Sequence, residues 1–328
     1  MALTGIQVRP YRLAFVKPLV TAAGTFSHRE GWVVRVRDTD GRIGYGDCSP
    51  WPGFGSTLSR VRSHMAELTA LERSELPEVR SAVACAVSDL EAQQAGVALA
   101  KWLSPSARDD AATHAFVSDV ATSVAAVGAG YTALKVKVAA DSVAVDCRRV
   151  RDIREAVGGG VRLRIDANGG WTVRAACDAL TAMKDLELDL VEQPVTGLDA
   201  MARVREATGV RIAADEGVTD AASLEQVVKL RAADVVVLKP AFLGGVRATF
   251  ELAEVARRAG LSVMVTHALE SAIGRAHALH LACALADDAI CGLGQPLAED
   301  VATLADPVAG RIAHPRGPGL GLVPGGVA

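Results

Sequence analysis

From about residue 110 onward, short apolar runs alternate with stretches of helical periodicity, and this pattern constrains the fold more than any other feature of the chain. Such alternation is typical of repeated β-α units around a parallel sheet. Eight runs favour a closed β/α barrel, with an open doubly wound sheet as the alternative because the first and last runs are weak. No G-x-G-x-x-G motif follows any run to support a dinucleotide fold. The runs cover residues 114–117, 133–138, 161–165, 188–191, 210–213, 235–238, 261–265 and 289–293.

The first hundred residues follow a different pattern. Two β-rich runs flank the pair Asp40-Gly41, a strong signal for a hairpin, and two helical patterns follow over residues 58–71 and 77–95. The length of 328 residues fits two domains, or one barrel with an attachment. We therefore expect an α+β capping domain over residues 1–105, a barrel over 106–305, and a tail over 306–328 that packs back on the capping domain.

Charge and composition narrow the class of partner. Basic and acidic residues nearly balance, at 35 and 38, and no block of like charges points to nucleic acid or an anionic membrane. No apolar run approaches the roughly 18 residues of a membrane span, and the start of the chain lacks a signal segment. Six widely spaced cysteines without a C-x-x-C pair fit a reducing compartment. These features predict a cytoplasmic protein that acts on a small molecule.

Charged residues close five successive apolar runs. They recur at intervals of 23 to 29 residues, about one strand, one helix and two loops. Because parallel strands of a barrel end at the same rim, and that rim carries the active site of β/α barrels, we expect these side chains to meet there. The closing residues are Lys135 and Lys137, Asp166, Glu192, Asp215 with Glu216, and Lys239.

Three of the closing residues are acids from three adjacent strands. Asp166, Glu192 and Asp215 would repel one another if they were crowded together without a counter-ion. Oxygen ligands of this kind suit Mg²⁺, with Mn²⁺ as a substitute, rather than zinc. Any one of these acids could instead be a helix N-cap or a solvated loop residue, but the ordered set predicts a metal site.

The lysines suggest the chemistry beside such a metal. Lys135 and Lys137 are two apart on one strand, so both side chains should point into the barrel, while Lys239 enters from four strands further round. Paired ammonium groups lower each other's pKa, so one lysine can be neutral near pH 7 and act as a general base. A metal beside it suits proton abstraction next to a carboxylate. The alternative is that the lysines only neutralise the acids.

These residues resemble the enolase superfamily and, within it, the muconate-lactonizing subgroup, in which K-x-K on strand two precedes single acids on strands three to five and a lysine on strand six. The similarity covers nearly the whole chain and is strongest to the o-succinylbenzoate synthase family. The segments that carry this narrower resemblance are residues 29–31, 44–50 and 52–54, Asp166-Ala-Asn168 with Trp171-Thr172, residues 269–271, Ile273-Gly274 and Gly292-Leu293.

The resemblance implies a modified TIM barrel with a capping domain and an Mg²⁺-dependent dehydration in menaquinone biosynthesis. Lys137 would abstract the α-proton of 2-succinyl-6-hydroxy-2,4-cyclohexadiene-1-carboxylate, and a metal on the three acids would stabilise the enediolate. Lys239 would lie as a cation on the opposite face, Lys135 would support the substrate carboxylate, and Glu216 could orient a lysine. The expected substrate-binding residues are Asn168, Arg29, Gly292 and Ser271, with His28 beside Arg29 as a further side chain near the site.

Other reactions of the same subgroup stay open on these residues. N-acylamino acid racemases and dipeptide epimerases use the same metal set with two opposed lysine bases, and muconate cycloisomerase is a third option. Against epimerases, residues 292–295 lack the Asp-x-Asp that many carry on strand eight. A strand-seven histidine is a base in the racemase branch, but that branch has another residue in place of Lys239, so we expect His267 to be a packing residue. A Schiff-base aldolase and a non-catalytic metal-binding barrel are more distant alternatives, and the oligomeric state is open.

Overall fold

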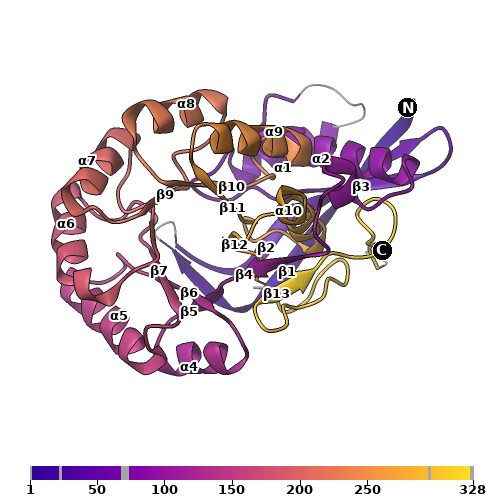
Figure 1. Ribbon diagram of the computed structural model, residues 1–328. Coiled ribbons are helices and arrows are strands. Elements are labelled where there is room, and N and C mark those ends of the chain that lie inside the picture. Colours follow the sequence, from indigo (N-terminus) through magenta and orange to yellow (C-terminus); the bar gives the residue numbers. More distant parts are fainter. Residues whose placement is uncertain (1, 22–23, 68–73, 295–296, 326–328) are drawn as a thin grey trace.

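The computed structural model describes the chain except for residues 1, 22–23, 68–73, 295–296 and 326–328 (Figure 1). Its N-terminal part is an antiparallel sheet of three strands in the order β1-β2-β3, covered by helices. The strands are β1 (Leu3–Thr21), β2 (Gly24–Asp38) and β3 (Ile43–Cys48), and the helices are α1 (Leu58–Glu67), α2 (Pro77–Gln94) and α3 (Leu99–Leu103). The sequence analysis placed the β2-β3 hairpin and the first two helices but overlooked β1; residues 68–71 of the first helical pattern lie outside the described residues.

The hairpin forms where the sequence predicts it. The Asp38 carboxylate accepts hydrogen bonds from the backbone N–H groups of Asp40 and Arg42, at 3.0 and 2.8 Å, and Gly41 supplies the positive φ of the turn. Two glycines of β3 then bring the sheet against α2. A Cβ at Gly44 or Gly46 would lie about 2 Å from a backbone carbonyl of α2, so only glycine permits this contact.

Seven parallel strands follow in the order β11-β10-β9-β8-β7-β6-β5, with a helix after each. Figure 1 shows the helices as an outer ring around the strands. The strands are β5 (Ala115–Val117), β6 (Ala133–Lys137), β7 (Arg162–Asp166), β8 (Leu190–Glu192), β9 (Ile212–Ala214), β10 (Val235–Leu238) and β11 (Ser262–Val265). The helices are α4 (Val120–Gly128), α5 (Val143–Val157), α6 (Val173–Ala182), followed by the short η1 (Lys184–Leu186), α7 (Leu198–Thr208), α8 (Ala221–Leu230), α9 (Gly245–Arg258) and α10 (Ala272–Leu285).

A short eighth strand closes the ring. β12 (Ile290–Cys291) pairs in parallel with β4 (Asp110–Thr113), which runs on into β5, and Thr266 just after β11 forms a parallel bridge with Gly292 just after β12. The chain therefore forms the predicted β/α barrel rather than an open sheet. The first and last apolar runs of the sequence are weak, and they correspond to the short strands β5 and β12.

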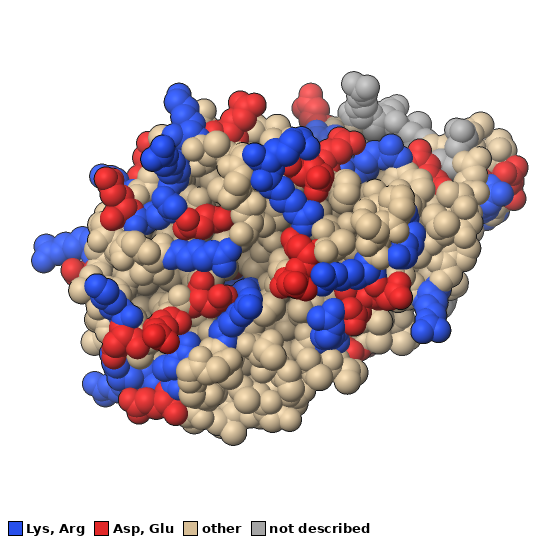
Figure 2. Space-filling view, in the orientation of Figure 1, with Lys and Arg blue, Asp and Glu red and all other residues tan. Residues whose placement is uncertain are grey.

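The barrel has an apolar middle between two charged ends. Leu190, Ala213, Val235, Val237 and Met264 form a buried cluster of their own, contributed by β8 to β11. A second and larger cluster lies between the strands and the outer helices. On the face drawn in Figure 2, basic and acidic side chains are interleaved rather than gathered into one basic area. None of the described helices is long and apolar enough to cross a membrane.

The C-terminal residues contact both parts of the molecule. β13 (Arg311–Ala313) pairs antiparallel with β4 of the barrel. Further on, Gly319 exchanges backbone hydrogen bonds with residues 97 and 99, next to α3, and the Leu320 N–H donates to the Asp89 carboxylate of α2 at 2.7 Å. The tail thus ties the first helices to the barrel.

Candidate active site

The charged residues that close the strands meet at one end of the barrel, which we call the rim. The parallel register places Lys137 of β6 opposite Asp166 of β7, and Asp166 opposite Glu192 of β8. Asp215 and Lys239 follow directly after β9 and β10. The side chains that the sequence analysis selected for their spacing therefore lie at the carboxyl ends of five neighbouring strands.

Two of the three lysines form ion pairs with the acids. The Lys135 ammonium lies 2.8 Å from Asp166 Oδ2 and 2.5 Å from Glu192 Oε1, and the Lys239 ammonium contacts Asp215 Oδ1. Lys135 and Lys239 are buried, whereas Lys137 is exposed and pairs with no acid among the described residues. Lys137 is thus the rim lysine whose amine is free to meet a ligand.

Burial and charge shift the protonation of this group. Burial raises the pKa of Glu192 to about 7 and that of Asp215 to about 6, although the adjacent lysine opposes the rise in each case. Burial alone would lower the pKa of Lys135, but Asp166 and Glu192 outweigh it, and the pKa of Lys135 is raised. The expectation that Lys135 and Lys137 lower each other's pKa is therefore wrong for Lys135, because two carboxylates hold its charge.

A small hollow opens beside Lys239, between the rim and the N-terminal part. Its volume is about 160 Å³, and Gly53, Phe54 and Gly55 contribute to its wall. The Phe54 ring stacks on Phe242 with centroids 5.3 Å apart, and the Lys239 ammonium lies 4.3 Å from the centre of the Phe54 ring. The loop after β3 thus forms an aromatic wall over one side of the rim.

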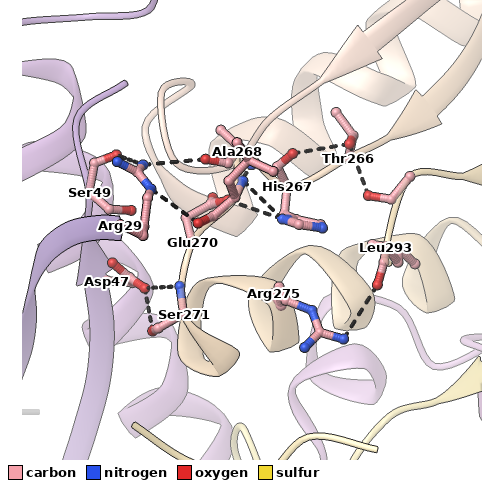
Figure 3. Close-up of polar contacts among 12 residues, drawn as sticks. Arg29, Asp47, Ser49, Thr266, His267, Ala268, Glu270, Ser271, Arg275 and Leu293 are labelled. Carbon is pink, nitrogen blue, oxygen red and sulfur yellow. Dashed lines mark hydrogen bonds and ion pairs between the residues drawn. The ribbon is translucent and has the colours of Figure 1, made fainter. Parts of the chain in front are cut away.

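Arg29 holds the N-terminal part to the barrel rather than projecting into the rim. Its guanidinium donates to the carbonyl groups of Ser49 and Ala268 (Figure 3) and to those of Pro50 and Leu269. It also lies over the Trp51 ring. The side chain is only 2 % exposed. Since its donors are already used, Arg29 positions the loop after β11; the neighbouring His28 contacts the Ser27 hydroxyl at 2.8 Å.

Ser271, Asp47 and His267 belong to the same junction (Figure 3). Ser271 caps α10, and both its N–H and its hydroxyl donate to Asp47 Oδ2 of β3. His267 Nδ1 accepts from the Leu269 N–H at 3.0 Å, and its Nε2 lies 2.7 Å from the Gly294 carbonyl. We call this group, with Arg29 and Glu270, the cap junction. Ser271 and His267 are thus engaged in holding the loop, as expected for His267 but not for Ser271.

Two family models match the chain. One, described as enolase C-terminal domain-like, matches residues 119–325, and the other, the o-succinylbenzoate synthase N-terminal domain, matches residues 6–92. The chain belongs to the enolase superfamily.

Relatives within this superfamily carry different names. An o-succinylbenzoate synthase of Thermobifida fusca is 37 % identical over 85 % of this chain and 78 % of its own. An L-Ala-D/L-Glu epimerase of Bacillus subtilis is 30 % identical over 97 % of this chain and 96 % of its own. A solved dipeptide epimerase of Enterococcus faecalis, complexed with Mg and a dipeptide, superimposes with a TM-score of 0.87 at 26 % identity, covering 98 % of this chain and 99 % of that one.

The rim acids have the donor chemistry of an enolase superfamily metal site. As placed, no three carboxylate, imidazole or thiol groups among the described residues are gathered closely enough to hold a metal ion. Instead, Lys135 and Lys239 occupy the carboxylate oxygens. Burial raises the pKa of Glu192 and of Asp215 although an ammonium group lies beside each, so a further positive charge would stabilise their ionised forms. A hard divalent cation fits this excess of oxygen ligands.

Asn168, Glu216 and Gly292 complete the predicted set. Asn168 Nδ2 donates to Glu216 Oε1 at 3.0 Å, so these two link the loops after β7 and β9. Gly292 has no room for a side chain, since a Cβ there would lie 2.6 Å from Thr266 Oγ1. Asn168 lies with the rim group, whereas Gly292 serves the closure of the barrel.

Two rim residues escaped the sequence analysis. Gln193 accepts from the Asp215 N–H at 2.9 Å and donates to the Val195 carbonyl, so it fixes the loop that carries Asp215. His114 lies inside the barrel beside Gly292, and neither of its ring nitrogens has a partner among the described residues. Its position at the start of the first apolar run was the only sequence signal, and a lone histidine there is no motif.

Proposed function

We propose that this protein is an Mg²⁺-dependent o-succinylbenzoate synthase that converts 2-succinyl-6-hydroxy-2,4-cyclohexadiene-1-carboxylate to o-succinylbenzoate and water. The observation that carries the proposal is Lys137, the exposed rim lysine that has no ion-pair partner within the described part of the chain and lies in register beside Asp166. Its counterpart Lys239 enters from β10, four strands further round a ring of eight. A substrate between them meets an amine on one face and an ammonium on the other.

The reaction needs a base and then an acid at one position. The Lys137 amine takes the proton from the carbon that carries the substrate carboxylate, and the resulting ammonium returns that proton to the hydroxyl of the neighbouring carbon, which leaves as water. The carbon–hydrogen and carbon–oxygen bonds break, a double bond forms between the two ring carbons, and the ring becomes aromatic without an oxidant. Lys239 stays protonated beside Asp215 and stabilises negative charge on the substrate from the other face.

Asp166, Glu192 and Asp215 would hold the divalent cation. When bound, it supplies positive charge beside the substrate carboxylate. Lys135 keeps its charge between Asp166 and Glu192 and orients both carboxylates, while the Phe54 and Phe242 rings exclude water near Lys239. A cytoplasmic location and a place in menaquinone biosynthesis belong to this proposal.

Racemisation or epimerisation is the second candidate, because Lys137 and Lys239 also suit two opposed bases and an epimerase relative covers nearly the whole chain. The end of β12 favours the synthase. A dipeptide needs an acid to hold its ammonium group, and the packing around Gly292 leaves no space for a side chain. The match of residues 6–92 to the synthase N-terminal domain supports the same choice.

The decisive experiment follows the ultraviolet absorbance of the cyclohexadiene substrate after addition of purified protein and Mg²⁺, then excess EDTA. Rapid loss of absorbance that EDTA stops supports the proposal. Lys229→Ala, which changes an exposed lysine of α8, is the matched control for lysine variants at the rim. If the substrate is stable, deuterium incorporation from D₂O into L-Ala-L-Glu or an N-succinyl amino acid would establish the second candidate in its place.

A further inference from the structure

The end of the barrel opposite the rim holds a second charged site. Two adjoining hollows of about 320 and 340 Å³ lie there, and both include Arg162, Asp287, Asp288 and Ile290 in their walls. Their volumes fall at the small end of the roughly 300–1,000 Å³ usual for ligand pockets. Six arginines line them against two aspartates, and we call this group the floor: Arg108, Arg162, Arg164, Arg211, Arg257 and Arg311, with Asp287 and Asp288.

Arg164 forms the inner wall of the floor. It is 6 % exposed, its Nε donates to Asp189 at 2.7 Å, and its Nη1 donates to the Ile290 carbonyl at 2.7 Å. Its Nη2 donates to none of the described residues, although the side chain lines the hollow. Arg164 therefore presents one donor to the hollow that no protein group among the described residues uses.

Arg162 and Arg211 bring uncompensated charge to the same hollow. The exposed Arg162 guanidinium forms no hydrogen bond or ion pair with the described residues, and the exposed Arg211 guanidinium donates, among them, only to the Ser262 hydroxyl, at 2.9 Å. The two aspartates of the wall are already engaged, since Asp287 accepts from Arg257 and Asp288 from Arg108. Arg162 and Arg211 thus bring charges without an ion pair among the described residues to a hollow that Arg164, paired with Asp189, also lines.

The strand geometry explains why these side chains converge. Arg162 and Arg164 are two apart on β7, so they share the face that also carries Asp166 at the rim. Arg211 lies directly before β9, two residues ahead of Ala213 of the buried inner cluster, and therefore continues the inward side of that strand. Neither residue is part of the metal or lysine group, which occupies the other ends of the strands.

We propose that the floor binds an oxyanion of the phosphate class, free or as the terminal group of a small metabolite. Guanidinium groups bind tetrahedral oxyanions by paired, charge-assisted hydrogen bonds, and arginine keeps its charge at any physiological pH. Arg164, held by Asp189, offers a preorganised donor at the inner wall of the hollow, and Arg162 and Arg211 line the same hollow. The proposal is independent of the reaction at the rim.

Calorimetric titration with inorganic phosphate at constant ionic strength tests the site. We expect binding by the wild-type protein and at least tenfold weaker binding by the double variant Arg162→Gln/Arg211→Gln. Arg203→Gln, which changes an exposed arginine of α7, should bind phosphate like the wild type. Thermal unfolding without phosphate shows whether the double variant is folded. Absence of binding at millimolar phosphate, or equal binding by the double variant, would overturn the proposal.

A second titration distinguishes binding at the floor from binding at the rim, where the lysines are also cations that attract phosphate. Lys239→Ala should retain phosphate binding at the floor; if that variant loses it while the double arginine variant keeps it, the proposal fails. Glycerol phosphate as the titrant distinguishes the two sources of the anion. Binding equal to or tighter than phosphate indicates a phosphorylated metabolite, and binding at least tenfold weaker indicates the free ion.

Discussion

The rim and the floor are two charged ends of one barrel, and they use different cations. The rim pairs lysines with three buried acids, whereas the floor pairs arginines with aspartates and leaves Arg162 and Arg211 without an ion pair among the described residues. A lysine ammonium is a compact charge whose pKa changes with its surroundings, and a guanidinium is a fixed, planar donor. Lysine therefore suits proton transfer at the rim, and arginine suits anion binding or structural support at the floor.

β7 shows this difference within five residues. Its inward face carries Arg162, Arg164 and Asp166 in turn, from the floor to the rim. Arg164 forms an ion pair with Asp189, directly before β8, and Asp166 forms one with Lys135 of β6. If the rim serves catalysis and the inner floor serves support, substitutions at the rim should lower turnover with little effect on the free energy of unfolding. Substitutions in the inner floor should mainly lower the free energy of unfolding.

The largest effect is expected for Lys137→Ala. Removal of a general base lowers kcat by about 10³-fold, within the usual range for such a residue. The free energy of unfolding should change by less than about 0.5 kcal/mol, because the exposed side chain makes no ion pair among the described residues. Turnover and urea unfolding are measured together with Lys229→Ala. Full turnover in Lys137→Ala would refute the role of this lysine.

Arg164→Met should have the next largest effect, and on stability. The change removes the partner of Asp189 and the donor to the Ile290 carbonyl inside the barrel. Loss of one member of a largely buried ion pair costs about 3 kcal/mol in the free energy of unfolding. Urea unfolding measures this loss, with Arg203→Met as the exposed control. A loss below 1 kcal/mol would mean that Arg164 is retained for binding rather than for support.

Much of the rim and little of the floor could be predicted from the sequence. Asp166, Glu192 and Asp215 each end an apolar run at nearly constant intervals, and a parallel barrel converts such spacing into proximity. Arg162 and Arg211 begin or precede their strands, where charged residues are common. These two arginines converge because of which face of each strand points inward, and their spacing in the sequence alone did not predict that they meet.

The cap junction shows a different limit of sequence reasoning. Arg29 and Ser271 were expected to touch substrate, because the resemblance placed their segments near the site. Their contacts are made across more than 200 residues of sequence, with Leu269 and Asp47 respectively. No local pattern reveals such partners. Strand β1 was overlooked for the same reason, because its structure depends on pairing with β2 and the alternation of its own residues did not predict a strand.

Asp47→Asn should change the pH dependence of stability. Burial raises the pKa of Asp47 to about 6, against the hydrogen bond from Ser271, whereas an unfolded aspartate has a pKa near 4. The folded state therefore binds more protons between these values, and this group makes stability fall as pH rises from about 4 to 6, by about 2 to 3 kcal/mol.

The measurement for Asp47 is urea unfolding at pH 4, 5, 6 and 7 for wild type and variant. The difference in unfolding free energy between them should move with pH across this window and level off above pH 6. Arg203→Met provides the comparison, because this exposed side chain pairs with no carboxylate among the described residues and its removal changes no titrating partner. A difference that is constant with pH would show that Asp47 has an ordinary pKa.

The smallest effect is expected for Gly217→Ser, at the rim loop beside Asp215. A Cβ at this position meets only the end of the flexible Leu198 side chain, at 2.8 Å, and the backbone φ is not positive. The unfolding free energy should fall by less than about 1 kcal/mol. Gly197→Ser is the contrast: its neighbourhood is open but its φ of 88° is strained for a side chain, so it should cost about 1 to 3 kcal/mol. If Gly217→Ser proves the more costly of the two, the loop after β9 is more tightly constrained than its contacts indicate, and the expectation that rim substitutions have little effect on folding fails at this loop.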